Sequence, residues 1–230
     1  MNRLPGLITL VKQVNPDILG LEEVSEWDTG NPTTIEQFAS ELNMVYYMAP
    51  TWSGSNPAIF SKYPILETEK LSAYVGNNGS LRAVVQLPGG QRLNVVIVHL
   101  DPSDPHLRSC EFDKLRRIME AYRAEPSILM GDTNTDPGNQ DAKYLINGGW
   151  ELVRSEGIDN IFVLSNQAWQ AEPICFATNI YNPDCFVDTW ISDHKPVGAI
   201  LSFYGYQNPL SPSVSPTPSP VDNYNYDTAP

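Results

Sequence analysis

The feature that most constrains the fold is a series of short apolar segments that are typical of β-strands. Two of them, 82–87 (RAVVQL) and 92–100 (RLNVVIVHL), are adjacent and are separated by Pro88, Gly89 and Gly90. Proline and glycine between two such segments are typical of a hairpin turn, which joins antiparallel strands. The chain is therefore predicted to contain an antiparallel pair, which disfavours a purely parallel sheet.

Helical periodicity is present in segments that flank these strands. Apolar residues between positions 4 and 11 recur at i, i+3, i+4 and i+7, which predicts a helix at the start of the chain. Pro16 predicts its end, because the residue before a proline is disfavoured in the helical region. We expect a second helix at roughly 34–42 and an amphipathic one at 106–124.

Hairpins mixed with helical crossovers predict an α/β (α+β) layered sandwich, with mixed sheets packed face to face and helices outside. About 205 residues suit one domain with a full core, so we place that domain at 1–205. The remaining strand candidates lie at 17–24, 44–49, 58–66 (AIFSKYPIL), 127–132, 158–164 and 195–203.

The last segment of the chain, 206–230, is rich in proline and serine. Such a composition buries too little apolar surface to order itself, so we expect a disordered tail or linker. No apolar run approaches the roughly 20 residues that span a bilayer, and we expect no transmembrane segment.

Net charge and cysteine content give information on the binding partners and the cellular compartment. The formal net charge is −13 and the sequence pI is about 4.5, which disfavours a broad electrostatic contact with duplex nucleic acid. Cys175 and Cys185 flank a loop-like stretch and could pair in an oxidising compartment, which leaves Cys110 as a buried helix residue. That pair and the tail favour an extracytoplasmic protein, with a cytoplasmic enzyme as the alternative.

Apolar strands in this chain repeatedly end in acids, amides or histidines. Asp132 and Asn134 follow one strand, and two positions apart in an extended segment they face the same way, so together they could align a water and a phosphoryl oxygen. The alternative is an Asx-type turn in which both side chains bond local backbone. His99 ends another strand, where a satisfied core histidine is the competing interpretation.

A second group lies near the C-terminal strand. His194 follows Asp193, and its imidazole can donate to a phosphoryl oxygen or a leaving group. Asp159 could orient that ring, although a polar turn before the last strand would also explain the pattern. Glu22 and Glu23 alternate across their strand, so we expect only one of them to face a site as a ligand for a hard cation such as Mg²⁺.

In this order, the segments NPDILGLEEV, NPAIFSKYPIL, NVVIVHL, SILMGDTN, GIDNIFV and ISDHKPV resemble the endonuclease/exonuclease/phosphatase superfamily, which has the DNase I-like fold. The resemblance covers about residues 4–203. It implies a divalent-metal-dependent hydrolase of phosphate esters, either a phosphodiesterase or a phosphatase, that uses in-line attack of an activated water. The implied cofactor is Mg²⁺, with Mn²⁺ or Ca²⁺ as alternatives.

The resemblance also implies roles for individual residues. Glu23 matches the metal-binding glutamate, Asp193 an acid involved in metal or water positioning, and Asp132 the acid that activates water. Asn134 matches the residue that holds the phosphoryl group. His99 matches a histidine that contacts the scissile phosphate, and Asp159 matches the acid that buttresses the second histidine, His194.

One departure concerns the start of the chain. Members of the superfamily begin with a strand that carries an asparagine near the metal, whereas this chain opens in the helix that follows it. We therefore expect one central strand to be missing and a sheet edge to be unpaired. A catalytically weakened member that acts as a binding module is the alternative function from another class.

The substrate class stays open at this point. A DNase I-like endonuclease, a phosphodiesterase of lipid headgroups and a small phosphomonoesterase acting on sugar phosphates are the candidates. The acidic charge disfavours duplex DNA, and the chain shows no basic stripe with interleaved aromatic residues. We expect a monomer.

Overall fold

The computed structural model describes residues 3–51, 53–71, 79–174 and 192–204. Its helices are α1 (Leu4–Val14), α2 (Thr34–Leu42), α3 (Pro105–Glu120) and α4 (Lys143–Asn147). Its strands are β1 (Ile18–Leu21), β2 (Val45–Met48), β3 (Ala58–Ser61), β4 (Ile65–Lys70), β5 (Ser80–Gln86), β6 (Arg92–His99), β7 (Ser127–Asp132), β8 (Trp150–Glu156), β9 (Asp159–Leu164), β10 (Ala168–Pro173) and β11 (Ala199–Tyr204).

The largest sheet has six strands in the order β4-β5-β6-β7-β9-β8. The central pair β6 and β7 is parallel, and every other neighbouring pair is antiparallel. The crossover between the two parallel strands runs through α3, as the connection between parallel strands requires. This arrangement confirms the predicted mixed sheet, and the β5–β6 hairpin confirms the turn at Pro88.

Opposite this sheet lie two smaller antiparallel sheets. One has three strands in the order β1-β3-β2, and the other pairs β10 with β11. The described strands of the second layer therefore form two separate sheets.

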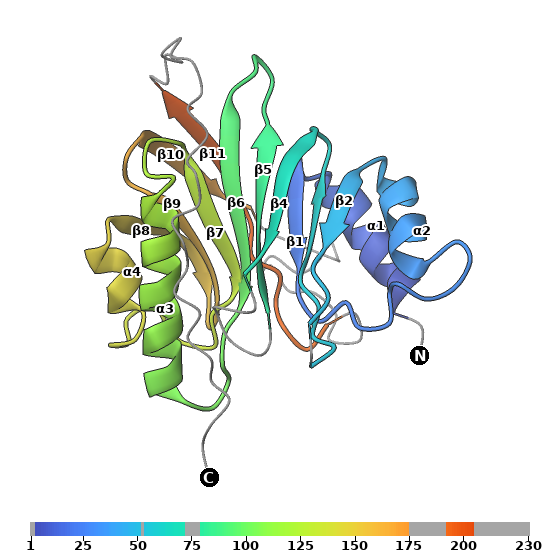
Figure 1. Ribbon diagram of the computed structural model, residues 1–230. Helices are drawn as coiled ribbons and strands as arrows, with labels where there is room; N and C mark the ends of the chain where they lie inside the picture. Colours follow the sequence, from blue (N-terminus) through green and yellow to red (C-terminus); the bar gives the residue numbers. More distant parts are fainter. Residues whose placement is uncertain (1–2, 52, 72–78, 175–191, 205–230) are drawn as a thin grey trace, which may run out of the picture.

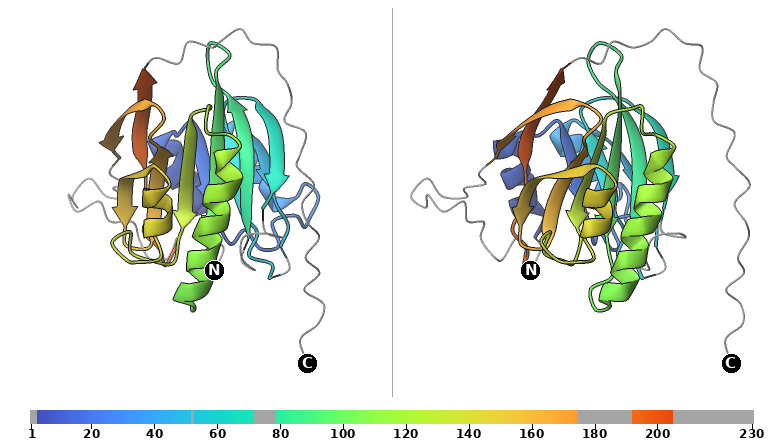
Figure 2. Two further views of the ribbon diagram at one scale, coloured as in Figure 1. Left: turned by 60° about the vertical axis from the view of Figure 1, so that its left-hand side comes forward. Right: turned by 90° about the vertical axis from the view of Figure 1, so that its left-hand side faces the viewer.

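The layers follow each other clearly in the ribbon diagrams. Figure 1 shows α3 and α4 on one outer side, α1 and α2 on the other, and the strands between them, and the turned views of Figure 2 agree. Three separate clusters of buried apolar side chains join the layers. One lies beneath α3 and α4, one between the sheets, and one beneath α1 and α2.

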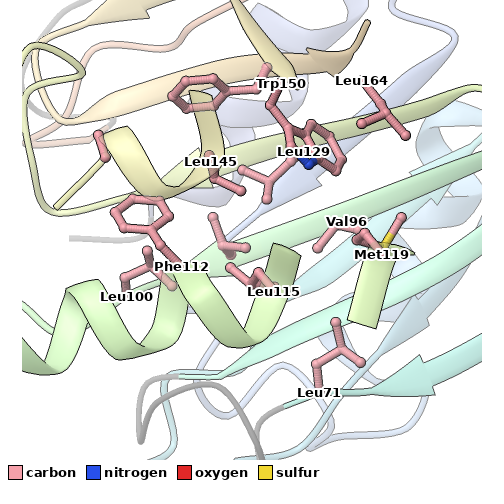
Figure 3. Close-up of a cluster of buried hydrophobic side chains, with 13 residues drawn as sticks. Leu71, Val96, Leu100, Phe112, Leu115, Met119, Leu129, Leu145, Trp150 and Leu164 are labelled. Atoms are coloured by element: carbon pink, nitrogen blue, oxygen red, sulfur yellow. The ribbon is translucent and has the colours of Figure 1, made fainter. Parts of the chain in front are cut away.

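Alternation along β6 illustrates how these layers are joined. Val96 and Val98 face the α3 cluster, whereas Val95 and Ile97 face the cluster between the sheets, and all four are fully buried. A strand buried on both faces is apolar throughout, because successive side chains point to opposite faces. Figure 3 shows the α3 cluster, in which Phe112, Leu115 and Met119 of α3 lie against Val96 and Leu129 of the sheet.

The helix boundaries agree well with those predicted from the sequence. Helix α1 ends at Val14, and Asn15 at φ 53° closes it before Pro16. Helix α2 begins with a capping box, in which the side chains of Thr33 and Glu36 satisfy each other's backbone N–H groups. Helix α3 ends at Glu120, four residues before the predicted end.

Two expectations are wrong. The segment 58–66 does not form one strand, because β3 and β4 belong to different sheets and the chain turns at Lys62–Pro64 between them. Cys110 is exposed rather than buried, since it lies on the solvent side of α3, whose buried face carries Phe112 and Leu115.

Several expectations concern residues outside the described ranges, namely the Cys175–Cys185 pair and the tail at 206–230. Among the described helices, none is long and apolar enough to cross a membrane.

Candidate active site

Three polar side chains lie side by side at one end of the large sheet. The register of β6 and β7 pairs His99 with Asp132, and the register of β7 and β9 pairs Asp132 with Asp159. All three residues are buried. The sheet therefore brings together three predicted site residues that are up to 60 positions apart in the chain.

The turn after β7 fixes the carboxylate of Asp132. Its Oδ1 accepts a hydrogen bond from the Asn134 backbone N–H at 2.7 Å, and Asn134 itself has a φ of 50°. The Asn134 side chain donates from Nδ2 to the Leu100 carbonyl at 2.9 Å. The Asx-type turn is thus present, and it leaves Asp132 Oδ2 directed at the two histidines.

Gly131 allows this turn to lie close to its neighbours. Its φ is 132°, and a Cβ at this position would lie 2.2 Å from the Val98 carbonyl oxygen and 2.4 Å from Glu22 Oε1. Backbone without a side chain is therefore required where β6, β7 and Glu22 converge.

His99 has polar neighbours at both nitrogens of its ring. Its Nδ1 lies 2.9 Å from Ser55 Oγ, and its Nε2 lies 3.7 Å from Asp132 Oδ2 and 4.0 Å from Glu23 Oε1. The bond at Nδ1 fixes the orientation of the ring and points Nε2 at the acids. Ser55 was not identified from the sequence, because a serine in a loop 44 positions before His99 carries no signal in spacing or type.

His194 is paired with Asp159. Its Nδ1 lies 2.9 Å from Asp159 Oδ2 and 4.0 Å from Asp132 Oδ2, and 41% of its side chain is exposed. Partial burial opposes protonation, but the carboxylates of Asp159, Asp132 and Asp193 outweigh it and raise the pKa of His194. Burial raises the pKa of Asp159 to about 6, and the His194 charge limits the rise.

Both glutamates after β1 lie at the site, contrary to the expectation that only one would. The strand ends at Leu21, and Glu23 has a φ of 57°, so the alternation of a regular strand no longer holds. Glu23 approaches His99 and is 71% exposed. Burial, together with the charges of Asp159 and Asp132, raises the pKa of Glu22 to about 8.

Asp193 lies at the margin of this group. Its side chain is 85% exposed and its Oδ1 lies 3.9 Å from Arg3 Nη1. It faces the same cavity as the others, but the structure directs it at Arg3 rather than at Asp132. Two of the predicted residues stand apart: Asp193, which is directed at Arg3, and Asn134, whose amide is directed at the Leu100 carbonyl.

These oxygen and nitrogen donors could hold a metal. Ligand atoms of Asp132, Asp159 and His194 all lie within 4.8 Å of one another. Burial also raises the pKa of Asp132, with Glu23 adding to the rise. Buried carboxylates gathered beside a histidine form a donor set that suits a hard divalent cation. The site opens into a cavity of about 1470 Å³.

Comparison with known proteins agrees with this geometry. A model described as the Endonuclease/Exonuclease/phosphatase family matches residues 2–194. A search of curated proteins gave no match.

Solved structures of related fold span nearly the whole chain. The human Nocturnin catalytic domain, solved with a bound sulfate anion, is 16% identical at a TM-score of 0.69, with 88% of this chain and 86% of that chain covered. A mannosyl-6-phosphatase of Bacteroides thetaiotaomicron is 18% identical at a TM-score of 0.66, with 87% of this chain and 91% of that chain covered. Truncated Caenorhabditis elegans TDP2 is 18% identical at a TM-score of 0.62, with 88% of this chain and 90% of that chain covered. At these identities the likeness shows the DNase I-like fold alone.

Proposed function

This chain belongs to the endonuclease/exonuclease/phosphatase family, and from that premise we propose that it is a divalent-metal-dependent hydrolase of phosphate esters. The observation that carries the proposal is the row formed by His99, Asp132 and Asp159 at one sheet end, with His194 against it. Acids that can accept a proton thus lie beside imidazoles that can donate one, as water attack on phosphorus requires.

Asp132 is suited to direct the attacking water. Its Oδ1 is occupied by the Asn134 N–H, so Oδ2 is the oxygen that can accept the proton of a water molecule. The family resemblance implies that Asn134 contacts a phosphoryl oxygen; its Nδ2 donates to the Leu100 carbonyl, which leaves one amide hydrogen for that contact. The rigid turn around Asp132 would keep the water in line with the leaving oxygen.

The two imidazoles are suited to neutralise the charge that develops on the phosphoryl group. His99 can donate from Nε2, because Nδ1 is engaged by Ser55. His194 can donate from the nitrogen that does not bond Asp159, and its raised pKa favours the protonated form. Asp159 stabilises that cation, much as a carboxylate orients a catalytic histidine elsewhere.

Glu23 would hold the divalent cation, with Glu22 beside it and Asp193 as the further acid that the family resemblance implies. A bound cation would supply Lewis-acid stabilisation of the phosphoryl oxygens. Mg²⁺ is the proposed metal, with Mn²⁺ and Ca²⁺ as alternatives that prefer the same oxygen donors.

Hydrolysis of bis-p-nitrophenyl phosphate tests the proposal. Chain stripped with EDTA should be inactive and should regain activity with Mg²⁺, Mn²⁺ or Ca²⁺. Asp132→Ala and His194→Ala should each reduce kcat by at least about 10³-fold. His106→Ala is the matched control, because His106 is exposed on α3 and should leave the rate unchanged.

Retained activity in either site variant would reject the assigned roles. A folded chain without activity on any phosphate ester would favour the binding module instead. Parallel assays with plasmid DNA, sphingomyelin, phosphoinositides and sugar phosphates would separate nuclease, lipid phosphodiesterase and phosphomonoesterase activity.

A further inference from the structure

A buried ion pair lies next to the turn that follows β7 and has no role in the chemistry described so far. Arg108 of α3 donates from Nε to Oδ2 of Asp141 at 2.9 Å, and the two side chains are 9% and 5% exposed. Taking two charges out of water is costly, and apolar side chains of similar volume are often at least as stable in such a place. Stability alone therefore does not account for the pair.

The carboxylate of Asp141 is bonded on both oxygens. Its Oδ2 accepts Arg108 Nε, and its Oδ1 accepts the Thr135 hydroxyl at 2.8 Å and the Ala142 N–H at 3.1 Å. Burial opposes ionisation, but the bonds from Arg108 and Thr135 outweigh it and lower the pKa of Asp141. Hydrogen bonds to a charged group are the stronger ones, so Asp141 fixes the residue that follows Asn134.

Arg108 also fixes the segment that follows β6. Its Nη1 donates to the Asp101 carbonyl at 2.9 Å. The preceding residue, Leu100, has its side chain buried in the α3 cluster (Figure 3). The Leu100 carbonyl is the acceptor for Asn134 Nδ2. One guanidinium thus stabilises the acceptor of the Asn134 amide and, through Asp141, the backbone beside Asn134.

Asn134 depends on such support because its φ is 50°. A residue in the left-handed region keeps that conformation only where the surrounding structure fixes it. Its two neighbours are buried threonines, and Thr133 Oγ1 donates to a carbonyl just before β9 whereas Thr135 Oγ1 donates to Asp141. A rotation at Asn134 would move its amide and would also break its N–H bond to Asp132 Oδ1.

We propose that Arg108 and Asp141 are positioning residues, which fix Asn134 and with it Asp132 in the geometry that hydrolysis requires. The inference rests on the proposed function, because it assigns the pair to the reaction at that site. The pair acts through Thr135 and the backbone, without contacting the phosphate ester. Its loss should therefore lower kcat rather than raise KM, since the misplaced groups act on the transition state.

Three variants of the full chain test the proposal. Thr135→Val removes the hydroxyl that donates to Asp141 and keeps the shape of the side chain, whereas Thr135→Ser keeps the hydroxyl. The double variant Arg108→Met with Asp141→Leu removes both charges and fills their space with apolar atoms, so the chain should stay folded.

The matched control is Arg82→Met. Arg82 is also a buried arginine, 2% exposed, and its Nε donates to Asn94 Oδ1 at 2.8 Å. Its guanidinium lies over the ring of Tyr122, beyond the C-terminal end of α3, whereas Arg108 lies in the first turn of that helix. Arg82→Met therefore removes a comparable buried cation at a distance from the active site.

The first readout is hydrogen exchange measured by NMR, which does not depend on activity. It follows the two amides of Asn134, the backbone N–H bonded to Asp132 and the side-chain Nδ2 bonded to Leu100. Thr135→Val and the double variant should speed their exchange by at least about 10-fold, and Thr135→Ser and Arg82→Met by less than about twofold. The Leu129 amide in the centre of β7 is the reference for global unfolding.

The second readout is the separation of kcat from KM with bis-p-nitrophenyl phosphate. Thr135→Val and the double variant should lower kcat about 10-fold and change KM by less than about twofold. Thr135→Ser should restore most of the rate. Arg82→Met should lower the stability of the chain and leave kcat unchanged, which a general effect of lost stability would not do.

Three results would overturn the proposal. Unchanged exchange at Asn134 in Thr135→Val would show that the pair does not fix it, and faster exchange with an unchanged kcat would show that the fixing does not serve the reaction. An equal loss of kcat in Arg82→Met would assign the effect to stability. If the parent chain hydrolyses no phosphate ester, the proposed function fails, and the exchange readout still decides whether the pair fixes Asn134.

Discussion

At the scale of single residues, the site depends on how each polar atom is engaged. Asp132 has one oxygen tied to a turn and the other directed at His99 and His194. His99 has one nitrogen tied to Ser55. Partly engaged groups of this kind keep one atom in a fixed place for chemistry, because the other atom holds the side chain in position.

Ser55 provides a direct test of that principle. Ser55→Ala removes the partner of His99 Nδ1 and frees the ring to rotate away from Asp132. We expect kcat to fall about 10-fold with little change in KM, the size of effect typical for the loss of an orienting hydrogen bond. Ser55→Thr retains the hydroxyl and should restore most of the rate. Equal losses in both variants would show that the loop, rather than the hydroxyl, matters.

Glu111 on α3 should make the stability of the folded chain depend on pH. It is 1% exposed, its Oε2 accepts the Asp101 N–H at 2.9 Å, and its Oε1 has no partner among the described residues. Burial raises its pKa to about 7, although that hydrogen bond limits the rise. The folded chain therefore holds this proton more tightly than the unfolded chain. Its stability falls as pH rises from the ordinary glutamate value to about 7.

Glu111→Gln removes this titration. The free energy of unfolding of the variant, relative to the parent, should increase by about 3 kcal/mol between pH 4.5 and pH 8. Urea unfolding at several pH values measures it, with Glu120→Gln on the same helix as the exposed control. A difference that does not vary with pH would contradict the raised pKa.

At the scale of elements, the decisive contact is the close approach of β6, β7 and the end of β1. Gly131 lies where a Cβ would be 2.2 Å from the Val98 carbonyl oxygen, and backbone cannot yield as a flexible side chain does. Gly89 also has a positive φ, of 89°, but nothing lies within 4 Å of a Cβ placed on it. The two positions therefore share a backbone conformation and differ in crowding.

Gly131→Ala and Gly89→Ala separate these two effects. Gly89→Ala should lower the free energy of unfolding by about 1 kcal/mol, the cost of a positive φ for alanine. Gly131→Ala should cost at least about 3 kcal/mol and should also reduce activity, since it displaces Asp132 and Glu22. Urea unfolding of both variants measures the difference. Equal losses of unfolding free energy in the two variants would mean that β7 moves and relieves the clash at Gly131.

The sequence predicts elements well where local chemistry decides them. Helix α1 ends where Pro16 requires it, and Thr33 with Glu36 begins α2. The short helix α4 and the strands β8 and β10 were not predicted. Strand β8 is only partly buried and lacks a clear alternating pattern, so its place depends on pairing with β9.

The same distinction holds for the site. Residues at the ends of apolar strands, such as His99 and Asp132, are visible in sequence because residue type and position coincide. Ser55 and the joint presence of Glu22 and Glu23 are not, because they depend on how the chain turns after a strand has ended. Loop geometry is set by tertiary contacts, and those contacts join segments far apart in the chain.

At the scale of the whole molecule, two properties act on any substrate. The layers place the candidate site at one end of the large sheet, where Glu23, which follows β1 of a smaller sheet, also contributes its side chain. The net charge of −13 surrounds that site with a field that repels anions. Because the field of exposed charges is screened by salt, ionic strength should affect large and small substrates differently.

This difference gives a test of the substrate class. At constant Mg²⁺, raising NaCl from 20 to 150 mM should increase kcat/KM for plasmid DNA several-fold, because screening reduces repulsion between two polyanions. Bis-p-nitrophenyl phosphate carries one charge and should change by less than about twofold. A protein that holds DNA through lysines and arginines would show the reverse, since salt weakens such contacts steeply. A fall in kcat/KM for DNA would therefore reveal a basic surface that the net charge conceals, and would favour the endonuclease over the phosphatase or lipid phosphodiesterase.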